Sequence, residues 1–233
     1  MKLTLVRHAT LLLDTESHGR VLVDPMLDPA GTRPPIEDTP NDLRNPLVEL
    51  PLPAADVVAG VDLCIVTHLH SDHFDAAAAA ALPRSTPILT QPESAAALRR
   101  LGFVDVRTAD ERIPMTRGRH GTGELGDDLG PVSGWVLDGV YLAGDTVWCD
   151  DVANALAAHS PRAVVVHGGG ARFVHGDPIV MDAADVRRVR AATDAPIVVV
   201  HLEAINHCVE PRDAYRGLPG VHVPADGEMI ELP

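Results

Sequence analysis

The segment "THLHSDHFD", Thr67–Asp75, restricts the fold of this chain more than any other. It places three histidines and two aspartates within eight residues, directly after the apolar run "VDLCIV" of residues 61–66. A short apolar run bounded by polar residues is typical of a buried strand, and ligand sites of α/β proteins gather at the carboxyl ends of strands. The segment therefore predicts an α/β fold with a binding site at one edge of a sheet.

The four donors His68, His70, Asp72 and His73 follow an H-x-H-x-D-H spacing. Histidine nitrogens and aspartate oxygens are ligands of zinc and of similar divalent ions. Two donors two residues apart can face one ion from a turn, and the next pair can face a second ion. A solvated histidine-rich turn is the alternative interpretation, and four donors at this spacing disfavour it.

The rest of the chain contains short strand-like runs and helical runs. Strands are predicted within residues 2–7, 10–14, 20–24, 62–67, 87–90, 104–109, 111–116, 130–145, 162–170, 195–203 and 228–232. Helices are predicted within residues 76–83, 92–102, 152–160, 181–193 and 211–218. Strands come in runs, and strand-helix pairs occur in both halves, so sheets sandwiched between helices are expected. We expect one domain over residues 1–233, because 45% of the residues are hydrophobic.

Residues 25–56 are predicted to form a lid-like loop. Eight prolines fall between Pro25 and Pro53, and proline removes backbone donors and restricts φ. The stretch "NPLVELPLP" at residues 45–53 carries leucine and valine, so it is expected to pack on an apolar surface. That surface is either its own domain or a neighbouring subunit, and a homo-oligomer therefore stays open.

Charge and cysteine content limit the partners and the compartment. The formal net charge of −14 repels nucleic acid and anionic membranes unless metal ions intervene, which favours a small-molecule substrate. Cys64, Cys149 and Cys208 are odd in number and widely spaced, so no disulfide framework is expected. A cytoplasmic protein is predicted, because neither a signal peptide nor an apolar run of ~20 residues is present.

The motif "THLHSDH" resembles the T-H-x-H-x-D-H signature of the metallo-β-lactamase superfamily in every fixed position. This resemblance implies a four-layer αβ/βα sandwich and a hydrolase site with one or two metal ions. It also implies three further ligands after later strands: a histidine, a bridging aspartate and a final histidine.

Two of these ligands have one candidate each. His120 in "TRGRHGTG" is the only histidine between His73 and His159; its alternative is an exposed loop histidine. Asp145 in "VYLAGDT" ends an apolar strand and resembles the bridging-aspartate motif, although aspartate is also a common helix N-cap.

The final histidine has two candidates in "PIVVVHLEAINHC". His201 directly follows a buried strand, as His68 does, and is therefore the predicted ligand. His207 is then a substrate-facing or structural residue.

The resemblance implies a site for two divalent ions, with zinc favoured and manganese, iron or nickel also compatible. His68, His70 and His120 would hold the first ion; Asp72, His73 and His201 would hold the second, and Asp145 would bridge them. A hydroxide formed between the ions would attack a carbonyl or phosphoryl centre, and Asp72 would take part in proton transfer.

Further candidates are weaker. His8, His167 and His175 could line the cleft and contact substrate; their alternatives are a packed strand end, a tight turn and an exposed loop. The glycines of "HGGG", residues 167–170, could offer backbone N–H groups to an anion.

The predicted function is a metal-dependent hydrolase of a small ester, lactone or phosphoester. Within the superfamily the chain looks most similar to the bacterial branch of ascorbate-phosphate lactonases, on His8, "VLVDP" at residues 21–25 and "GDPIVMDAADV" at residues 176–186. The alternatives are a phosphodiesterase acting on nucleotides or nucleic acid, and a metal-binding protein without catalysis.

Overall fold

The computed structural model describes residues 1–233, and its strands form two sheets. The first has the strand order β13-β1-β2-β3-β4-β5-β6. Its strands are β1 (Lys2–Arg7), β2 (Thr10–Asp14), β3 (Arg20–Val23), β4 (Leu63–Val66), β5 (Ile88–Thr90), β6 (Val106–Arg107) and β13 (Met229–Glu231). β1 to β3 form an antiparallel meander, whereas β3 to β6 run parallel, so their carboxyl ends meet at one edge.

The second sheet has the order β12-β11-β10-β9-β8-β7. Its strands are β7 (Met115–Arg117), β8 (Ser133–Leu137), β9 (Val140–Leu142), β10 (Ala163–His167), β11 (Ile197–Val200) and β12 (Val221–His222). β9 to β12 run parallel. The strands β4, β10 and β11 are buried at every position, which explains why their sequences are continuous apolar runs.

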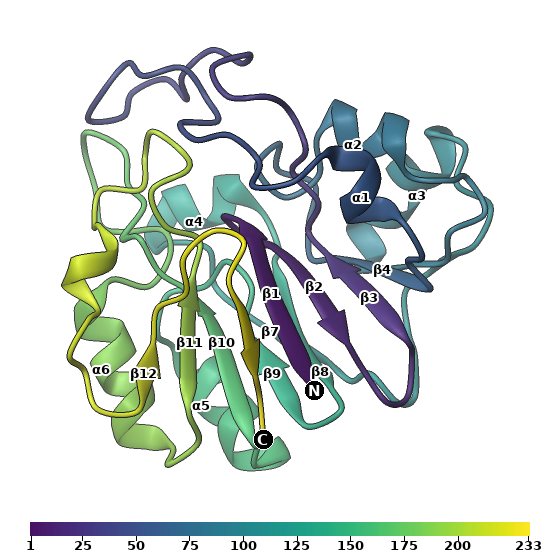
Figure 1. Cartoon of the computed structure of the whole chain (residues 1–233). Helices are drawn as coiled ribbons and strands as arrows, with labels where there is room; N and C mark the ends of the chain where they lie inside the picture. The colour runs from purple at the N-terminus through teal and green to yellow at the C-terminus, as the bar shows by residue number, and fades with distance from the viewer.

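The two sheets pack face to face between outer layers of helices (Figure 1). One buried cluster joins side chains of both sheets, among them Leu5 and Ile65 from the first and Trp135 and Val198 from the second. The first sheet is covered by α1 (Ala54–Val58), α2 (Ala76–Ala81) and α3 (Pro92–Arg100), and the second by α5 (Asp150–His159) and α6 (Ala183–Ala192). The predicted four-layer αβ/βα sandwich is confirmed. No helix is long and apolar enough to cross a bilayer.

The structure differs from the predicted helices in two places. The helix α4 (Gly123–Leu129) was not expected, because "GELGDDL" contains two glycines and buries no residue. Within residues 211–218 only a 3-10 turn forms, at Arg212–Ala214. The next residue, Tyr215, is fully buried, and Gly217 adopts φ +81°, so the chain turns away from a helical path.

The proline-rich segment is irregular up to Pro53, and α1 occupies the last three residues of the predicted loop. It packs on its own chain: Leu50 and Leu52 contact the cluster between α1–α3 and the first sheet. Its start is fixed by Arg7, which is fully buried at the end of β1. The Arg7 guanidinium donates to the carbonyl oxygens of Met26, Asp28 and Val48 at 2.8–2.9 Å.

Candidate metal centre

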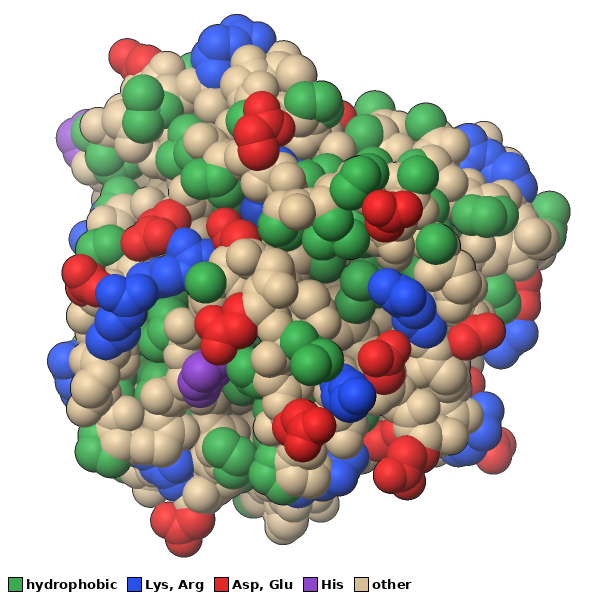
Figure 2. Space-filling model, in the orientation of Figure 1, with side chains coloured by type: hydrophobic (Ala, Val, Ile, Leu, Met, Phe, Trp, Pro, Cys, Tyr) green, Lys and Arg blue, Asp and Glu red, His purple; other side chains and the backbone are tan.

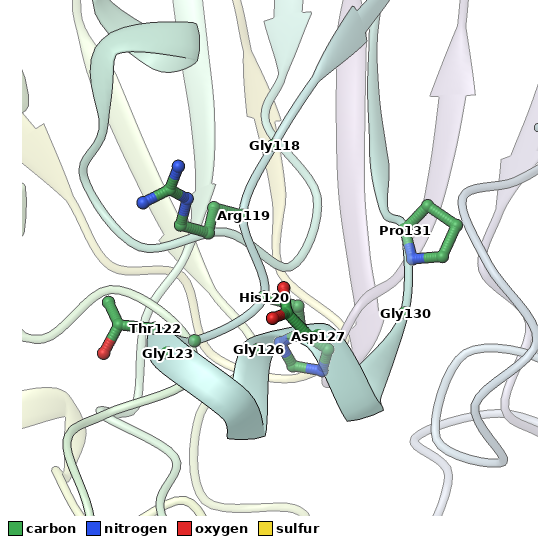
Figure 3. A pocket seen from close by; sticks show the side chains of 10 residues that line it. Gly118, Arg119, His120, Thr122, Gly123, Gly126, Asp127, Gly130 and Pro131 are labelled. Carbon is green, nitrogen blue, oxygen red and sulfur yellow. The ribbon is translucent and has the colours of Figure 1, made fainter.

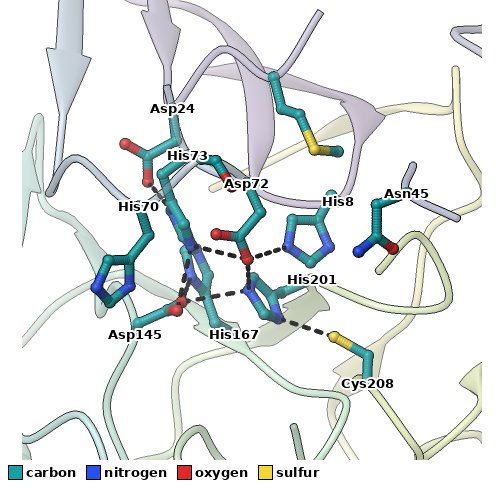
Figure 4. Close-up of polar contacts among 12 residues, drawn as sticks. His8, Asp24, Asn45, His70, Asp72, His73, Asp145, His167, His201 and Cys208 are labelled. Atoms are coloured by element: carbon teal, nitrogen blue, oxygen red, sulfur yellow. Dashed lines mark hydrogen bonds and ion pairs between the residues drawn. The ribbon is translucent and has the colours of Figure 1, made fainter. Parts of the chain in front are cut away.

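The site lies where strands from both sheets end (Figure 4). The polar residues that follow or close these strands are His8 after β1, Asp24 after β3, His68 after β4, Asp145 near the end of β9, His167 at the end of β10, and His201 after β11. All six are buried. The packing of the two sheets therefore brings together side chains that are distant in the sequence.

The first set of donors, the outer group, consists of His68, His70 and His120, whose ring nitrogens lie within 4.8 Å of one another. His68 Nε2 and His70 Nδ1 are 3.0 Å apart, because both residues belong to one turn. The Nδ1–H of His120 donates to the Ile179 carbonyl oxygen at 2.8 Å. This hydrogen bond fixes the tautomer and leaves the His120 Nε2 lone pair free as a ligand.

The second set, the inner group, consists of Asp72, His73 and His201. The Nε2 atoms of His73 and His201 lie 3.9 and 3.7 Å from Asp72 Oδ2. His8 joins this group: its Nε2 lies 3.3 Å from the same oxygen, and its ring centroid is 3.6 Å from that of His201. The structure thus supplies the inner group with a fourth donor.

Asp145 lies between the two groups. Its Oδ2 is 3.6 Å from His120 Nε2 and 4.0 Å from His68 Nε2 on the outer side, and 3.1 Å from His73 Nε2 on the inner side. Its Oδ1 is 3.5 Å from His201 Nε2 and accepts a 2.7 Å hydrogen bond from His167 Nδ1–H. One carboxylate therefore contacts five histidines, which is the position that a bridging ligand needs.

The donor set fits divalent cations. The Nδ1–H of His73 donates to Asp24 Oδ2 at 2.8 Å, and His201 Nδ1 lies 3.6 Å from Cys208 Sγ. Both rings therefore direct Nε2 into the inner group, where these atoms are buried without a hydrogen-bond partner. Buried nitrogens are rarely left unpaired in proteins, and a bound cation would satisfy both.

The packing of histidines and aspartates in the site also shifts their pKa values. Burial alone lowers the pKa of a histidine, and it lowers the pKa values of His68 and His120. Burial acts on His73 too, but the carboxylates of Asp145, Asp24 and Asp72 outweigh it and raise its pKa to about 10. The surrounding histidines hold the pKa values of Asp72 and Asp145 well below their usual range despite burial. Both carboxylates are therefore ionised and available as ligands.

The backbone at the site is strained. His8, Asp24 and His201 adopt φ values of +59°, +42° and +68°, a left-handed region that costs about 1 kcal/mol or more for such residues. The His201 N–H donates to the His8 carbonyl oxygen at 2.9 Å and ties the end of β11 to the end of β1. Strain of this kind persists where the surrounding contacts determine the conformation, as they do here.

The weaker candidates are placed differently. His167 belongs to the cluster because it hydrogen-bonds Asp145. His175 is exposed on the loop between Phe173 and Ile179 and lies outside the cluster. His207 is buried and belongs to neither donor group.

The glycines after His167 do not form an anion-binding nest, so that expectation is wrong. Gly168 N–H donates to Val200, Gly169 N–H to the Tyr215 hydroxyl, and Gly170 N–H to Met181. All three N–H groups are used inside the protein.

A cavity of about 330 Å³ opens onto the donor groups. Its polar wall is formed by His70, Ser71, Asp72, His120, Asp145 and His207. Its apolar wall is formed by Ile36 of the proline-rich loop, Leu69, Leu129 of α4, Phe173 and Ile179. No lysine or arginine lines it. The cavity thus combines metal-binding groups with hydrocarbon side chains in its lining.

A second cavity, of about 490 Å³, is lined by residues of the segment 118–131 and shares His120 with the first (Figure 3). Five of its ten lining residues are glycines and none is hydrophobic. Gly126 allows α4 to approach the turn after His120, since a Cβ there would lie 2.9 Å from the Gly121 carbonyl oxygen. The glycines near His120 therefore serve the close packing of α4.

Three supporting residues were not identified from the sequence. Asp24 accepts from His73 and from both the backbone N–H and the hydroxyl of Thr67, each at 2.7–2.8 Å. Arg7 anchors the proline-rich loop, and the Asn206 side chain binds the same loop through Ile36, Thr39, Asn41 and Asn45. In the sequence, these three residues could have been found only by their positions, because each is a charged or polar residue beside a strand end or beside a predicted site residue.

Comparisons with known proteins agree with this geometry. Residues 19–202 match the family model of the β-lactamase superfamily domain. The UPF0173 protein YddR of Bacillus subtilis (strain 168) is 35% identical over 98% of both chains.

Two solved structures are similar over the whole chain. An isothiocyanate hydrolase from Delia radicum gut bacteria is 36% identical, with a TM-score of 0.93, and the match covers 100% of this chain and 99% of that one. A possible metal-dependent hydrolase from Veillonella parvula DSM 2008 is 32% identical, with a TM-score of 0.92 and the same coverage.

Proposed function

Since the chain belongs to the metallo-β-lactamase superfamily and is a metal-dependent hydrolase, we propose that its substrate is a small uncharged molecule with an electrophilic carbon. Esters, lactones and isothiocyanates are of this kind. The observation that carries this proposal is the cavity, which joins two groups of metal donors to an apolar wall and contains no cationic side chain.

In this proposal the outer group holds one divalent ion and the inner group holds a second, with Asp145 as the shared ligand. Zinc suits donors of this type, and manganese, iron and nickel are alternatives. When bound, such ions supply Lewis acidity for the electrophile and for the activation of water.

The chain's own residues position the reaction. Asp72 lines the cavity as an ionised carboxylate and is the proposed proton acceptor. His8 donates to Asp72 and His167 donates to Asp145, so each carboxylate is held in one orientation. The apolar wall excludes water from the side of the cavity where the substrate's hydrocarbon group would lie.

The charge distribution disfavours phosphodiesters and nucleic acid. Apart from the proposed metal ions, a phosphate group in the cavity would meet two carboxylates and no lysine or arginine. On the face drawn in Figure 2, basic and acidic side chains are interspersed, and the formal net charge is −14. A polyanion gains little from such a surface, because phosphate recognition depends on clustered lysine and arginine.

The test is metal content and turnover of the chain purified without chelator. About two ions per chain are expected in the wild type and in the control His175→Ala, and fewer in Asp145→Ala. Turnover is expected on uncharged esters, lactones or isothiocyanates rather than on phosphodiesters. A wild-type protein that binds no metal, or one that hydrolyses only phosphodiesters, would contradict the proposal.

A further inference from the structure

Outside the two donor groups and Asp145, the cavity has only two polar side chains, those of Ser71 and His207. Ser71 is exposed, whereas His207 is 4% exposed. The Nδ1 atom of His207 is buried without a hydrogen-bond partner. A buried polar atom without a partner is uncommon and calls for an explanation, and the imidazole that carries this atom lines the cavity.

His207 is separate from the metal donors. It belongs to none of the sets whose ligand atoms lie within 4.8 Å of one another. Its ring centroid is 6.4 Å from that of His201, and the two rings are perpendicular, at 89°. The imidazole therefore borders the cavity beside the inner group without joining it.

The backbone that carries His207 is also held in place. The preceding residue, Asn206, binds the proline-rich loop through its side chain, and the following residue, Cys208, contacts His201. The His207 carbonyl oxygen accepts from Arg172 N–H at 3.0 Å. Three consecutive residues thus contact the loop, the cavity and the inner group, and a backbone fixed in this way preorganises the position from which His207 meets a ligand.

We propose that His207 is a catalytic residue that hydrogen-bonds the reacting group of the substrate from the polar lining of the cavity. This inference rests on the proposed hydrolase function. Burial lowers the pKa of His207 to about 4, so the imidazole is uncharged at neutral pH and offers one N–H donor and one lone pair. An uncharged donor stabilises a developing negative charge on oxygen or sulfur and attracts no anionic competitor.

The test compares the wild type with His207→Ala, His207→Asn and His207→Gln. His207→Ala is expected to keep the wild-type metal content and to lower kcat by about 10²-fold, the usual effect of removing one such donor. The Asn amide can replace Nδ1–H and the Gln amide can replace Nε2–H, so one of the two should recover part of kcat and identify the donating nitrogen.

Two results would overturn the role of His207. Loss of metal in His207→Ala would make His207 a ligand, and wild-type kcat in His207→Ala would make it structural. Both leave the hydrolase function standing, because the wild type still turns over. Absence of turnover in a metal-loaded wild type would instead contradict the proposed function.

Discussion

The outer and inner donor groups are built alike, but they differ in burial and in the histidines that lie beside them. In the outer group, His68 and His70 come from one turn, and His70 is half-buried beside the cavity. In the inner group, Asp72 and His73 come from the same turn and His201 follows β11, and all three are buried. Each group therefore joins two donors of this turn to one histidine that follows a strand of the second sheet, and the groups differ in burial, because only the outer group has a half-buried ligand.

The inner group also has two further histidines beside it. His8 and His167 lie within reach of Asp72 and Asp145, while the outer group has three histidines and the shared Asp145. We expect the two groups to respond differently when one ligand is removed.

The largest effect is expected from His120→Ala, compared with His201→Ala. His120→Ala leaves two histidines in the outer group, so we expect loss of one ion per chain and turnover lower by at least about 10³-fold. In His201→Ala, His8 and His167 remain beside the inner ion, which should stay bound with weaker affinity. Elemental analysis and turnover of both variants measure this difference. Equal metal loss in the two variants would show that the groups do not differ in their response to the loss of a ligand.

A smaller effect is expected from Asp24→Asn. The amide keeps the size of the side chain but replaces the carboxylate that accepts from His73 and Thr67. Loss of such a supporting carboxylate costs about 10–100-fold in metal affinity, and only the inner ion should be affected. Metal titration gives both affinities. Asp38→Asn, at an exposed residue that also has positive φ, is the matched control, and an equal change in the outer ion would contradict the assignment.

The inner group should also give metal binding a pH dependence. Because Asp145, Asp24 and Asp72 raise the pKa of His73 to about 10, this ring is protonated in the metal-free protein at neutral pH. The pKa of His201 is also raised well above its usual value, because Asp145, Cys208 and Asp72 outweigh its burial. Binding must release these protons, so affinity should rise by about tenfold or more per pH unit between pH 7 and 9.

Calorimetry in two buffers of different ionisation enthalpy detects this release, and identical heats would refute it. In the metal-free protein the sign is reversed. The raised pKa of His73 stabilises the fold fully below pH 6.5, and this contribution is lost as pH rises through about 10.

The smallest effect is expected from Cys208→Ser. The contact between Sγ and His201 Nδ1 is 3.6 Å long, and thiols are weak hydrogen-bonding groups. A neutral hydrogen bond contributes about 1 kcal/mol, so the affinity of the inner ion should change by less than about tenfold. A change as large as that of Asp24→Asn, measured in the same titration, would show that the sulfur orients His201 as strongly as the carboxylate orients His73.

The sequence was sufficient to predict the layers and the order of the donors along the chain. Each buried strand of the parallel regions is a continuous apolar run, and a donor follows several of these runs, as His68 follows β4 and His201 follows β11. Such signals are local, so they can be read without knowing which strands are neighbours.

The supporting contacts could not be predicted, because they depend on strand order. Asp24 reaches Thr67 and His73 only because β3 pairs with β4 in a parallel register that sets Val23 beside Ile65. Arg7 closes the strand-like run of residues 2–7, and its burial depends on three carbonyl groups of a loop without periodicity. The helix α4 was missed because no apolar stripe marks it.

The hydrogen bond from His201 N–H to the His8 carbonyl oxygen has a consequence for the order in which the site forms during synthesis. The ribosome makes β1 first and β11 near the end, so almost the whole chain must emerge before this contact can close. The outer group can form earlier, once Ile179, whose carbonyl oxygen holds His120, has been made. The inner group is completed only after β11 joins its sheet, so a nascent chain or a truncated product acquires the two groups one after the other.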